Sequence, residues 1–340
     1  MIFRLYDFYK IYSLVTKTDF SNNDELLNLK KSMIKNGTIF IKICQYVSQN
    51  PNLLYKLLNK DKDKDINPQI LNIKKLLLST KNNIPYHTLN HTLQVIKTLN
   101  INIDLNSDLP LASGSIAQVY LDSTQTKIIK VNHPNILEEL TYDLKLIKYI
   151  KNIFGYFYTF LTIFDINSFS NNLKNQCNLN NEAKYTEILS KNFEIYKYEN
   201  IFFPKIYFKS ENLIIEEYIS GYHFEKFIKI YPKYDIVAKI KTLAAIFQMG
   251  LIDGFIHADC HNGNIIYNKI SNDIRVTFID CGIISNISIT VKKAIIQIIK
   301  SITTKNYNLL FDNLPHIICG DLNLSDVDKE KIFDILDVSG

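Results

Sequence analysis

Hydrophobic residues recur at helical spacing through the first third of the chain. Ile39, Ile43 and Val47 stand four residues apart, which predicts an amphipathic helix that ends before a proline. A second helix with one apolar face is predicted at 87–99. Residues 1 to about 105 are therefore expected to form a helical extension.

The pattern changes at Pro110, where short β-type runs begin to alternate with long helical ones. Strands are predicted at 116–121, 126–131, 205–208, 213–218, 264–267 and 275–280. Long helices are predicted at 135–152 and 168–192. This order of short strands and long helices favours an α+β protein.

The composition is that of an ordinary globular protein. Of 340 residues, 46% are hydrophobic and 21% charged, and the formal net charge is only +5. Arg4 and Arg275 are the only arginines, which argues against nucleic-acid binding, because such proteins use arginine for bidentate contacts. The charge pattern therefore gives no reason to expect a nucleic-acid partner.

The five cysteines are scattered, without C-x-x-C spacing, which favours a reducing intracellular compartment and no disulfide framework. No N-terminal signal segment stands out. The longest apolar run, at 152–164, is shorter than the ~18 residues of a membrane-spanning helix. We expect a buried or interfacial helix there, and a soluble or peripherally membrane-bound protein.

The stretch "HADCHNGNI" at 257–265 places several side chains that could bind a metal or act in catalysis close together. His257, Asp259 and His261 are residue types that bind zinc or iron. The same stretch also fits a phosphoryl-transfer loop, in which Asp259 is the base and Asn264 a magnesium ligand. A polar turn between a helix and a strand is the third interpretation.

Two further segments, in the right order, favour phosphoryl transfer over a metal site. Asp280 follows a predicted strand and precedes Cys281 and Gly282, as the magnesium-binding aspartate of a kinase does. Asn264 and Asp280 would supply the oxygen ligands that magnesium prefers. Upstream, Lys130 in "KIIKV" fits the lysine that holds the α- and β-phosphates.

As an ordered set, these segments resemble the UbiB/ADCK family of atypical kinase-like proteins. The resemblance rests on "KICQYVSQNP", "LASGSIAQVY", "IIKVNHP", "EEYISG", "HADCHNGN" and "IDCG", which run from about residue 35 to 285. It implies a two-lobed protein-kinase-like fold with a helical N-terminal extension. The expected domains are the extension at 1–105, an N-lobe at 106–218 and a C-lobe at 219–340.

The resemblance also implies roles, residue by residue. Its catalytic residues would be Asp259 and Lys130, and its magnesium ligands Asn264 and Asp280. ATP would contact Lys130 together with the loop Ala112, Ser113, Gly114 and Ser115 and the hinge residues Glu217 and Tyr218. The supporting residues would be Lys42 and Gln45 of the family's K-x-G-Q helix, Glu182 behind the lysine, and His257.

ATP and Mg²⁺ are the cofactors that this resemblance implies. Family members are tied to membrane-lipid and quinone metabolism. The expected activity is therefore ATP hydrolysis or phosphorylation of a small or lipid-like acceptor, with peripheral membrane contact.

Several positions depart from the family pattern. Gln176 and Asn178 replace a carboxylate pair, so Lys130 must pair with Glu182 or remain unpaired. Cys44 replaces the glycine of K-x-G-Q, and Cys281 replaces the phenylalanine of D-F-G.

Two more departures concern the nucleotide pocket. Ile128 adds bulk where kinases have alanine. Gly114 instead favours close approach of a phosphate. The alternative hypothesis, motivated by Gln176, Asn178, Ile128 and Cys281, is a pseudokinase-like regulatory module that binds a nucleotide or lipid without turnover.

One histidine pair lies outside these motifs. His87 and His91 are four residues apart on one face of the predicted helix at 87–99. No Glu, Asp or Cys accompanies them in the sequence, so a metal-binding role is not favoured.

Overall fold

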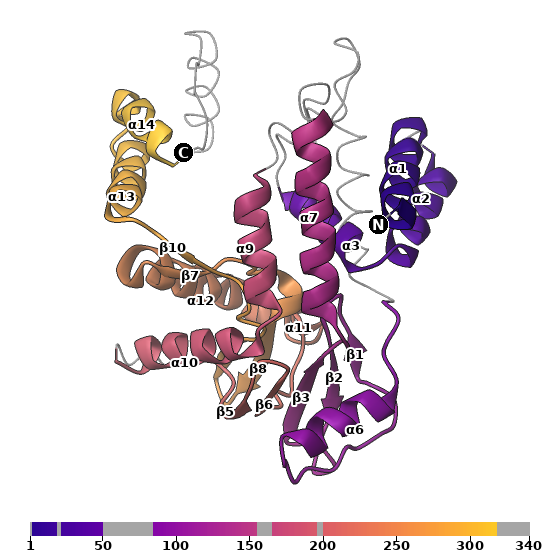
Figure 1. Ribbon diagram of the computed structural model, residues 1–340. Helices are drawn as coiled ribbons and strands as arrows, with labels where there is room; N and C mark the ends of the chain where they lie inside the picture. Colours follow the sequence, from indigo (N-terminus) through magenta and orange to yellow (C-terminus); the bar gives the residue numbers. More distant parts are fainter. Residues whose placement is uncertain (1, 19–21, 50–83, 155–164, 196–199, 318–340) are drawn as a thin grey trace. The chain divides into compact units, whose positions relative to one another are not determined.

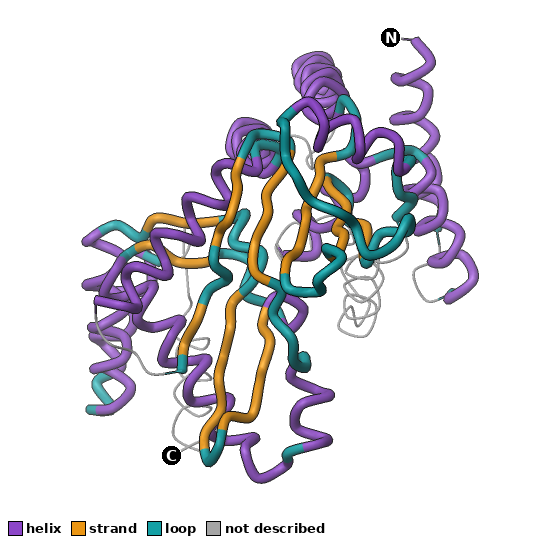
Figure 2. The backbone as a smooth tube through the Cα atoms, turned by 90° about the horizontal axis from the view of Figure 1, so that it is seen from below, coloured by secondary structure: helices purple, strands orange, loops and turns teal. Residues whose placement is uncertain are grey.

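The computed structural model describes residues 2–18, 22–49, 84–154, 165–195 and 200–317. The described chain combines helices with three separate β-sheets (Figure 2), which confirms the predicted α+β class. It divides into two compact units. The first comprises Met1–Lys184 and Lys205–Tyr218, and the second comprises Tyr185–Pro204 and Ile219–Gly340.

The first unit is built on a five-stranded sheet in the order β1-β2-β3-β6-β5. Its strands are β1 (Ala112–Ser113), β2 (Ala117–Leu121), β3 (Lys127–Asn132), β5 (Ile206–Lys209) and β6 (Leu213–Glu217). All neighbouring strands are antiparallel. Short turns join β1 to β2, β2 to β3 and β5 to β6, as antiparallel pairing allows, whereas the long segment 133–205 separates β3 from β5.

Alternation along β3 decides which side chains face which side of this sheet. Ile129 and Val131 are fully buried against helix α6 (Leu89–Thr98), which lies beside β2 and β3 in Figure 1. Lys130, between them, must point to the opposite face, because successive side chains of a strand alternate. On that face Ile214 packs against Leu179 and Ala183 at the start of helix α10 (Leu179–Ile195).

Helices of the N-terminal part and the middle of the chain form a second core of the first unit. They are α1 (Ile2–Lys17), α2 (Asn23–Lys35), α3 (Thr38–Gln49), α7 (Ile136–Phe154) and α9 (Ile166–Gln176). Their buried side chains make one apolar cluster that includes Leu29, Ile39, Val47 and Leu144. The apolar face predicted for residues 39–47 is thus the face that α3 buries.

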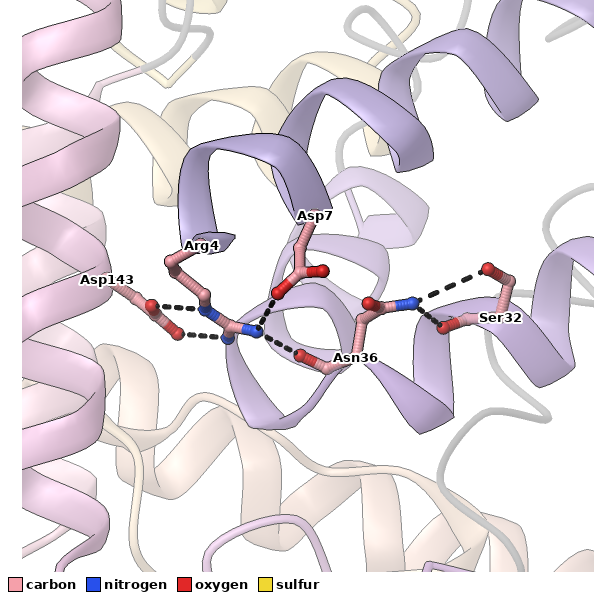
Figure 3. Close-up of polar contacts among 5 residues, drawn as sticks. All are labelled: Arg4, Asp7, Ser32, Asn36 and Asp143. Atoms are coloured by element: carbon pink, nitrogen blue, oxygen red, sulfur yellow. Dashed lines mark hydrogen bonds and ion pairs between the residues drawn. The ribbon is translucent and has the colours of Figure 1, made fainter. Parts of the chain in front are cut away.

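A single arginine ties α1 to the rest of this helical core (Figure 3). Arg4 donates two parallel hydrogen bonds to the carboxylate of Asp143 on α7, with Nε–Oδ1 and Nη2–Oδ2 distances of 2.7 Å and 2.5 Å. Its Nη1 also donates to the backbone carbonyl of Asn36, at 2.7 Å. Asp7 lies 3.4 Å from the same nitrogen. The arginine fork therefore joins α1, the end of α2 and α7.

The second unit carries a three-stranded sheet in the order β4-β9-β8 and a two-stranded sheet of β7 and β10. The strands are β4 (Ile201–Phe202), β7 (Phe255–His257), β8 (Ile265–Ile270), β9 (Asp273–Phe278) and β10 (Ile284–Asn286). The α-helices are α11 (Phe224–Ile230), α12 (Asp235–Phe247), α13 (Ile289–Thr303) and α14 (Tyr307–Asn313). Short helical turns are η1 (Pro232–Tyr234), η2 (Gln248–Asp253), η3 (Asn262–Asn264) and η4 (Leu314–His316).

The structure corrects several predicted boundaries. The single helix expected at 168–192 is two helices, α9 and α10, which are interrupted at Cys177 and Asn178. Leu179 donates its backbone N–H to the Glu211 carbonyl, and Asn178 Oδ1 accepts from the N–H of Asn180, so these amides leave the helical pattern. The strands β1, β4, β7 and β10 have only two or three residues each, too few to show alternation.

No helix in the described ranges is long and apolar enough to cross a membrane. Of the apolar run at 152–164, residues 152–154 end α7, and the remainder lies outside the described residues.

Candidate active site

An ion pair in the first unit joins Lys130 on β3 to Glu182 on α10. The Lys130 Nζ lies 2.9 Å from Glu182 Oε1 and 2.8 Å from Oε2. The two side chains are 17% and 5% exposed. Of the two outcomes that the sequence allowed for Lys130, the structure shows the pairing with Glu182. The ammonium is therefore fixed at one point above the sheet.

The predicted phosphate loop lies one strand away from this pair. Ala112 and Ser113 form β1, and Gly114 and Ser115 lead into β2. Gly114 has no positive φ, and a Cβ added to it would lie 3.4 Å from the Ala117 carbonyl oxygen, an ordinary contact. The turn itself thus does not require glycine, which leaves close approach of a ligand as a reason for it.

The predicted hinge residues stand at the end of β6. Glu217 donates its backbone N–H to the Lys205 carbonyl at 2.9 Å, and Tyr218 donates its own to the Thr126 carbonyl at 2.9 Å. Both backbone donors are therefore engaged within the protein. An adenine ring would have to be read through other groups of this segment.

Helix α3 presents the residues of the K-x-G-Q-like motif. Lys42 Nζ donates to Gln176 Oε1 on α9 at 2.7 Å, and Gln45 is half-buried on the same helix. Gln176 thus accepts from Lys42, whereas Lys130 uses Glu182. Ser48 lies at the end of α3, and its side chain is outside the described residues.

Cys44, at the glycine position of that motif, belongs to the helical core. Only 2% of it is exposed, and its Sγ contacts the Met33 sulfur. Burial raises the pKa of the Cys44 thiol to about 12, so it remains a neutral packing group. At the glycine position of the K-x-G-Q motif, this chain therefore has a buried cysteine side chain.

In the second unit, the His257 ring makes hydrogen bonds to the backbone of Ile279 and of Asp259. His257 is 2% exposed; its Nε2 lies 3.3 Å from the Ile279 carbonyl oxygen, and its Nδ1 accepts the Asp259 N–H at 3.2 Å. Burial lowers the pKa of His257, opposed by the Ile279 hydrogen bond and by the charges of Asp280 and Asp259. A neutral His257 therefore orients the loop on which Asp259 lies.

Asn264 and Asp280 lie at the same end of the β8–β9 hairpin. Asn264 is the last residue of η3, not the first of a strand as predicted, and its Nδ2 donates to the Asp259 carbonyl at 3.1 Å. The Ile279 N–H donates to the Asn264 carbonyl at 2.9 Å, which brings Asp280 beside it. β9 ends at Phe278, so Asp280 lies beyond the strand.

Asp280 adopts a left-handed backbone conformation with φ of 57°. Its carboxylate is exposed, and Cys281 after it is fully buried in the core of this unit. The donor set of Asn264 and Asp280, amide and carboxylate oxygens, suits a hard cation such as magnesium.

The alternative metal site of His257, Asp259 and His261 is not supported. Both ring nitrogens of His257 are already in hydrogen bonds to the backbone. His261 Nδ1 accepts the Gly263 N–H at 3.0 Å, and its Nε2 lies 3.7 Å from Asp259 Oδ2. Throughout the described ranges, no group of three or more His, Cys, Asp or Glu side chains is arranged to hold a metal ion.

The sequence did not reveal that His133 contacts the predicted phosphate loop, or that a second histidine, His87, contacts His133. His133, three residues after Lys130, lies with its Nε2 2.9 Å from the Gly114 carbonyl oxygen. His87 Nδ1 lies 2.8 Å from His133 Nδ1. The two residues are 46 positions apart, and no periodic pattern links them.

Comparison with known proteins agrees with this architecture. The ABC1 atypical kinase-like domain matches residues 103–314, which is more than half of the chain. An uncharacterized protein of Synechocystis, slr0889, is 27% identical over 296 residues, covering 81% of this chain and 68% of its own length. The ABC1 family protein YPL109C, mitochondrial, of Saccharomyces cerevisiae is 25% identical over 72% of this chain and 40% of its own length.

Two further similarities concern named kinases and the fold. The probable protein kinase UbiB of Blochmanniella pennsylvanica is 29% identical over 53% of this chain and 35% of its own length. The Rv3197–erythromycin structure from Mycobacterium tuberculosis superposes with a TM-score of 0.53 at 17% identity, covering 74% of this chain and 66% of that one. The chain thus spans between about a third and two thirds of these proteins. It has the predicted kinase-like fold, and it belongs to the ABC1 (UbiB/ADCK) family of atypical kinase-like proteins.

Proposed function

We propose that the chain is an ATP- and magnesium-dependent atypical kinase or ATPase. The observation that carries the proposal is the Lys130–Glu182 pair, with both carboxylate oxygens within 2.9 Å of the ammonium. A buried lysine fixed by a carboxylate, on the strand beside a small-residue loop, is the arrangement that kinases use to hold nucleotide phosphates. Lys130 would therefore contact the phosphates, next to Gly114 of the loop.

The second unit supports the remaining roles. Asn264 and Asp280 would hold magnesium, which, when bound, neutralises the charge of the phosphates. Asp259 would accept or orient the proton of the attacking hydroxyl or water. Two hydrogen bonds to the Asp259 backbone support this role: His257 accepts from the Asp259 N–H, and Asn264 donates to the Asp259 carbonyl. Such preorganised charge supplies most of the catalysis in this type of site.

For the acceptor, we propose a small or lipid-like molecule, or water. The resemblance to UbiB-type proteins, which are tied to quinone and membrane-lipid metabolism, motivates this choice. Peripheral contact with a membrane is part of the same proposal. Two relatives have the names probable protein kinase UbiB and probable serine/threonine-protein kinase abkC, so phosphorylation of a protein is the outcome to test against it.

The alternative function is a nucleotide- or lipid-binding regulatory module without turnover. The observation that favours it is the neutral pair Gln176 and Asn178, where the family has carboxylates. Gln176 accepts from Lys42, and Lys130 pairs with Glu182. Binding of Mg-ATP without release of phosphate is what this alternative predicts.

The experiment combines titration calorimetry with Mg-ATP and an assay of phosphate release. The purified chain is compared with Asp259→Asn and with Asp312→Asn, a control at an exposed position on α14. We expect binding in all three proteins and turnover in the wild type and the control only. Binding without turnover in the wild type would favour the regulatory module, and failure to bind Mg-ATP would overturn both functions.

A matched assay of protein phosphorylation decides the acceptor class. Transfer of phosphate from ATP to a generic protein substrate, lost in Asp259→Asn, would contradict the small-molecule or lipid-like acceptor.

A further inference from the structure

Two histidines from distant parts of the first unit form a hydrogen-bonded row that ends on the predicted phosphate loop. His87 Nε2 lies 2.8 Å from Thr92 Oγ1, and His87 Nδ1 lies 2.8 Å from His133 Nδ1. His133 Nε2 lies 2.9 Å from the Gly114 carbonyl oxygen. The row thus runs from α6, through the residue that follows β3, to the loop between β1 and β2.

The chemistry of its last member fixes every hydrogen in the row for neutral rings. The Gly114 carbonyl can only accept, so His133 must carry its hydrogen on Nε2. Its Nδ1 is then an acceptor, and His87 must donate from its own Nδ1. His87 Nε2 is left as an acceptor that faces the Thr92 hydroxyl, which also lies 3.4 Å from the Tyr120 hydroxyl. One carbonyl oxygen therefore specifies the tautomer of both rings.

The surroundings keep both rings neutral. Burial lowers the pKa of His87 to about 4, and the neighbouring His133 and His91 add to the effect. Burial also lowers the pKa of His133, as does the charge of His91, while the hydrogen bond to Gly114 opposes this. His91 is the third ring of the cluster, 4.7 Å from His87 between centroids, and its Nε2 faces the Asn132 carbonyl at 3.3 Å. A neutral row with one hydrogen order is the stable form at neutral pH.

His133 holds the loop at two points. Besides the Nε2 contact with Gly114, its backbone N–H donates to the Ile116 carbonyl at 2.8 Å. The loop also closes on itself, because the Gly114 N–H donates to the Ala117 carbonyl at 2.9 Å. His133 follows directly on the strand that carries Lys130, so one short segment sets both the lysine and the loop.

We propose that His133 is a positioning residue for the nucleotide-binding loop and that His87 sets the tautomer in which it acts. The inference rests on the proposed function, since the loop is taken to contact a nucleotide. The physical reason is that a loop already held in its bound conformation loses less conformational entropy on binding than a free loop does. Neither histidine is proposed to contact the reacting atoms, a role given above to Asp259 and Lys130.

Two amides of different length test this role at position 133. Glutamine offers a donor near the place of Nε2 and an acceptor for His87, so His133→Gln should keep the row. Asparagine is one methylene shorter, and its amide falls near the place of Nδ1. His133→Asn should therefore serve His87 but lose Gly114. His91→Gln is the matched control, because it alters the same cluster without a contact to the loop.

The first readout is hydrogen exchange of a peptide covering residues 111–118, in the protein without nucleotide. Loss of one hydrogen bond of about 1.4 kcal/mol corresponds to about a tenfold change in an equilibrium constant. We expect exchange at the Gly114 amide to be about tenfold faster in His133→Asn, and near the wild-type rate in His133→Gln and His91→Gln.

The second readout is the Kd of Mg-ATP in the same four proteins. It should rise about five- to tenfold in His133→Asn and recover to within about twofold in His133→Gln. Thermal melts establish that each variant is folded, and His133→Phe replaces the asparagine variant if that one does not fold.

The two readouts separate two kinds of failure. Equal loop exchange in the asparagine and glutamine variants would overturn the positioning role itself. Absence of Mg-ATP binding by the wild type would overturn the proposed function, and with it the nucleotide part of this inference, while the exchange data would still decide whether His133 holds the loop. Faster exchange with an unchanged Kd would refute the link between the loop and the nucleotide.

Discussion

Removing one member of the Lys130–Glu182 pair should destabilise the protein more than the loss of a surface ion pair, and removing both should cost no more than removing one. The perturbations are Lys130→Met, Glu182→Gln and the double variant. The carboxylate is 5% exposed and the lysine side chain 17%, so neither charge has water to replace its partner fully. Each single variant leaves one charge in that environment.

The magnitude follows from this burial. Breaking a buried ion pair by removing one partner costs about 3–5 kcal/mol. We take about 2.5 kcal/mol for each single variant, because the 17% exposure of Lys130 allows some hydration and Glu182 can take up a proton. The double variant removes both charges of the pair, and we expect a loss of about 2 kcal/mol. The two substitutions should therefore couple by about 3 kcal/mol, in the direction of compensation.

The assay is urea unfolding followed by circular dichroism at neutral pH, because the chain has no tryptophan. Mg-ATP binding by the same proteins provides a second measurement. The double variant should regain stability relative to the sum of the singles, yet bind Mg-ATP at least tenfold more weakly than the wild type, because Lys130 is missing. Additive losses of stability would refute the pairing, and wild-type nucleotide affinity of Lys130→Met would refute the phosphate-binding role.

Three further predictions concern other parts of the first unit. Arg4→Ala should lower the free energy of unfolding by about 2–4 kcal/mol, because it leaves the Asp143 carboxylate, 6% exposed, without its bidentate partner; Arg4→Lys should recover less than half of this in urea unfolding. Burial lowers the pKa of His87 to about 4 in the folded protein, below its ordinary value of 6.5. The free energy of unfolding should therefore be highest above about pH 6.5 and fall as the pH drops toward 4. Melts at several pH values should show a smaller slope in His87→Asn. Gly114→Ala should leave the melting temperature within about 1 °C, since the added Cβ lies 3.4 Å from the Ala117 oxygen, but weaken Mg-ATP binding severalfold in calorimetry if the loop touches a phosphate; unchanged affinity would contradict that contact.

The family and the α+β kinase-like class could be predicted from the sequence because both depend on ordered, local patterns. The strand that carries Lys130 shows its alternation directly, and the apolar spacing of α3 identifies the face that it buries. For Lys130 the sequence allowed two outcomes, a pair with Glu182 or no partner, and the structure shows the pair.

Features that depend on contacts between distant segments could not be predicted. The bond of Lys42 to Gln176 joins residues 134 positions apart, and the His87–His133 contact joins residues 46 apart. Neither leaves a period in the sequence, because each depends on how helices and strands pack. The left-handed conformation of Asp280 could not be predicted either, since aspartate is common in every backbone region that turns use.

The central claim is that magnesium and ATP act together at this site, and thermal melting of the wild type and Asp280→Asn tests it most directly. A ligand at 100 times its Kd adds about 2.7 kcal/mol of stability, which corresponds to a shift of a few degrees for a protein of this size. Asparagine tolerates the φ of 57° found at position 280, so the variant can keep the backbone conformation of the wild type, and each shift is measured from the protein's own melting temperature without ligand. The account predicts a magnesium-dependent shift with ATP in the wild type and none in Asp280→Asn; an equal magnesium-dependent shift in both proteins, or none in the wild type, would contradict it.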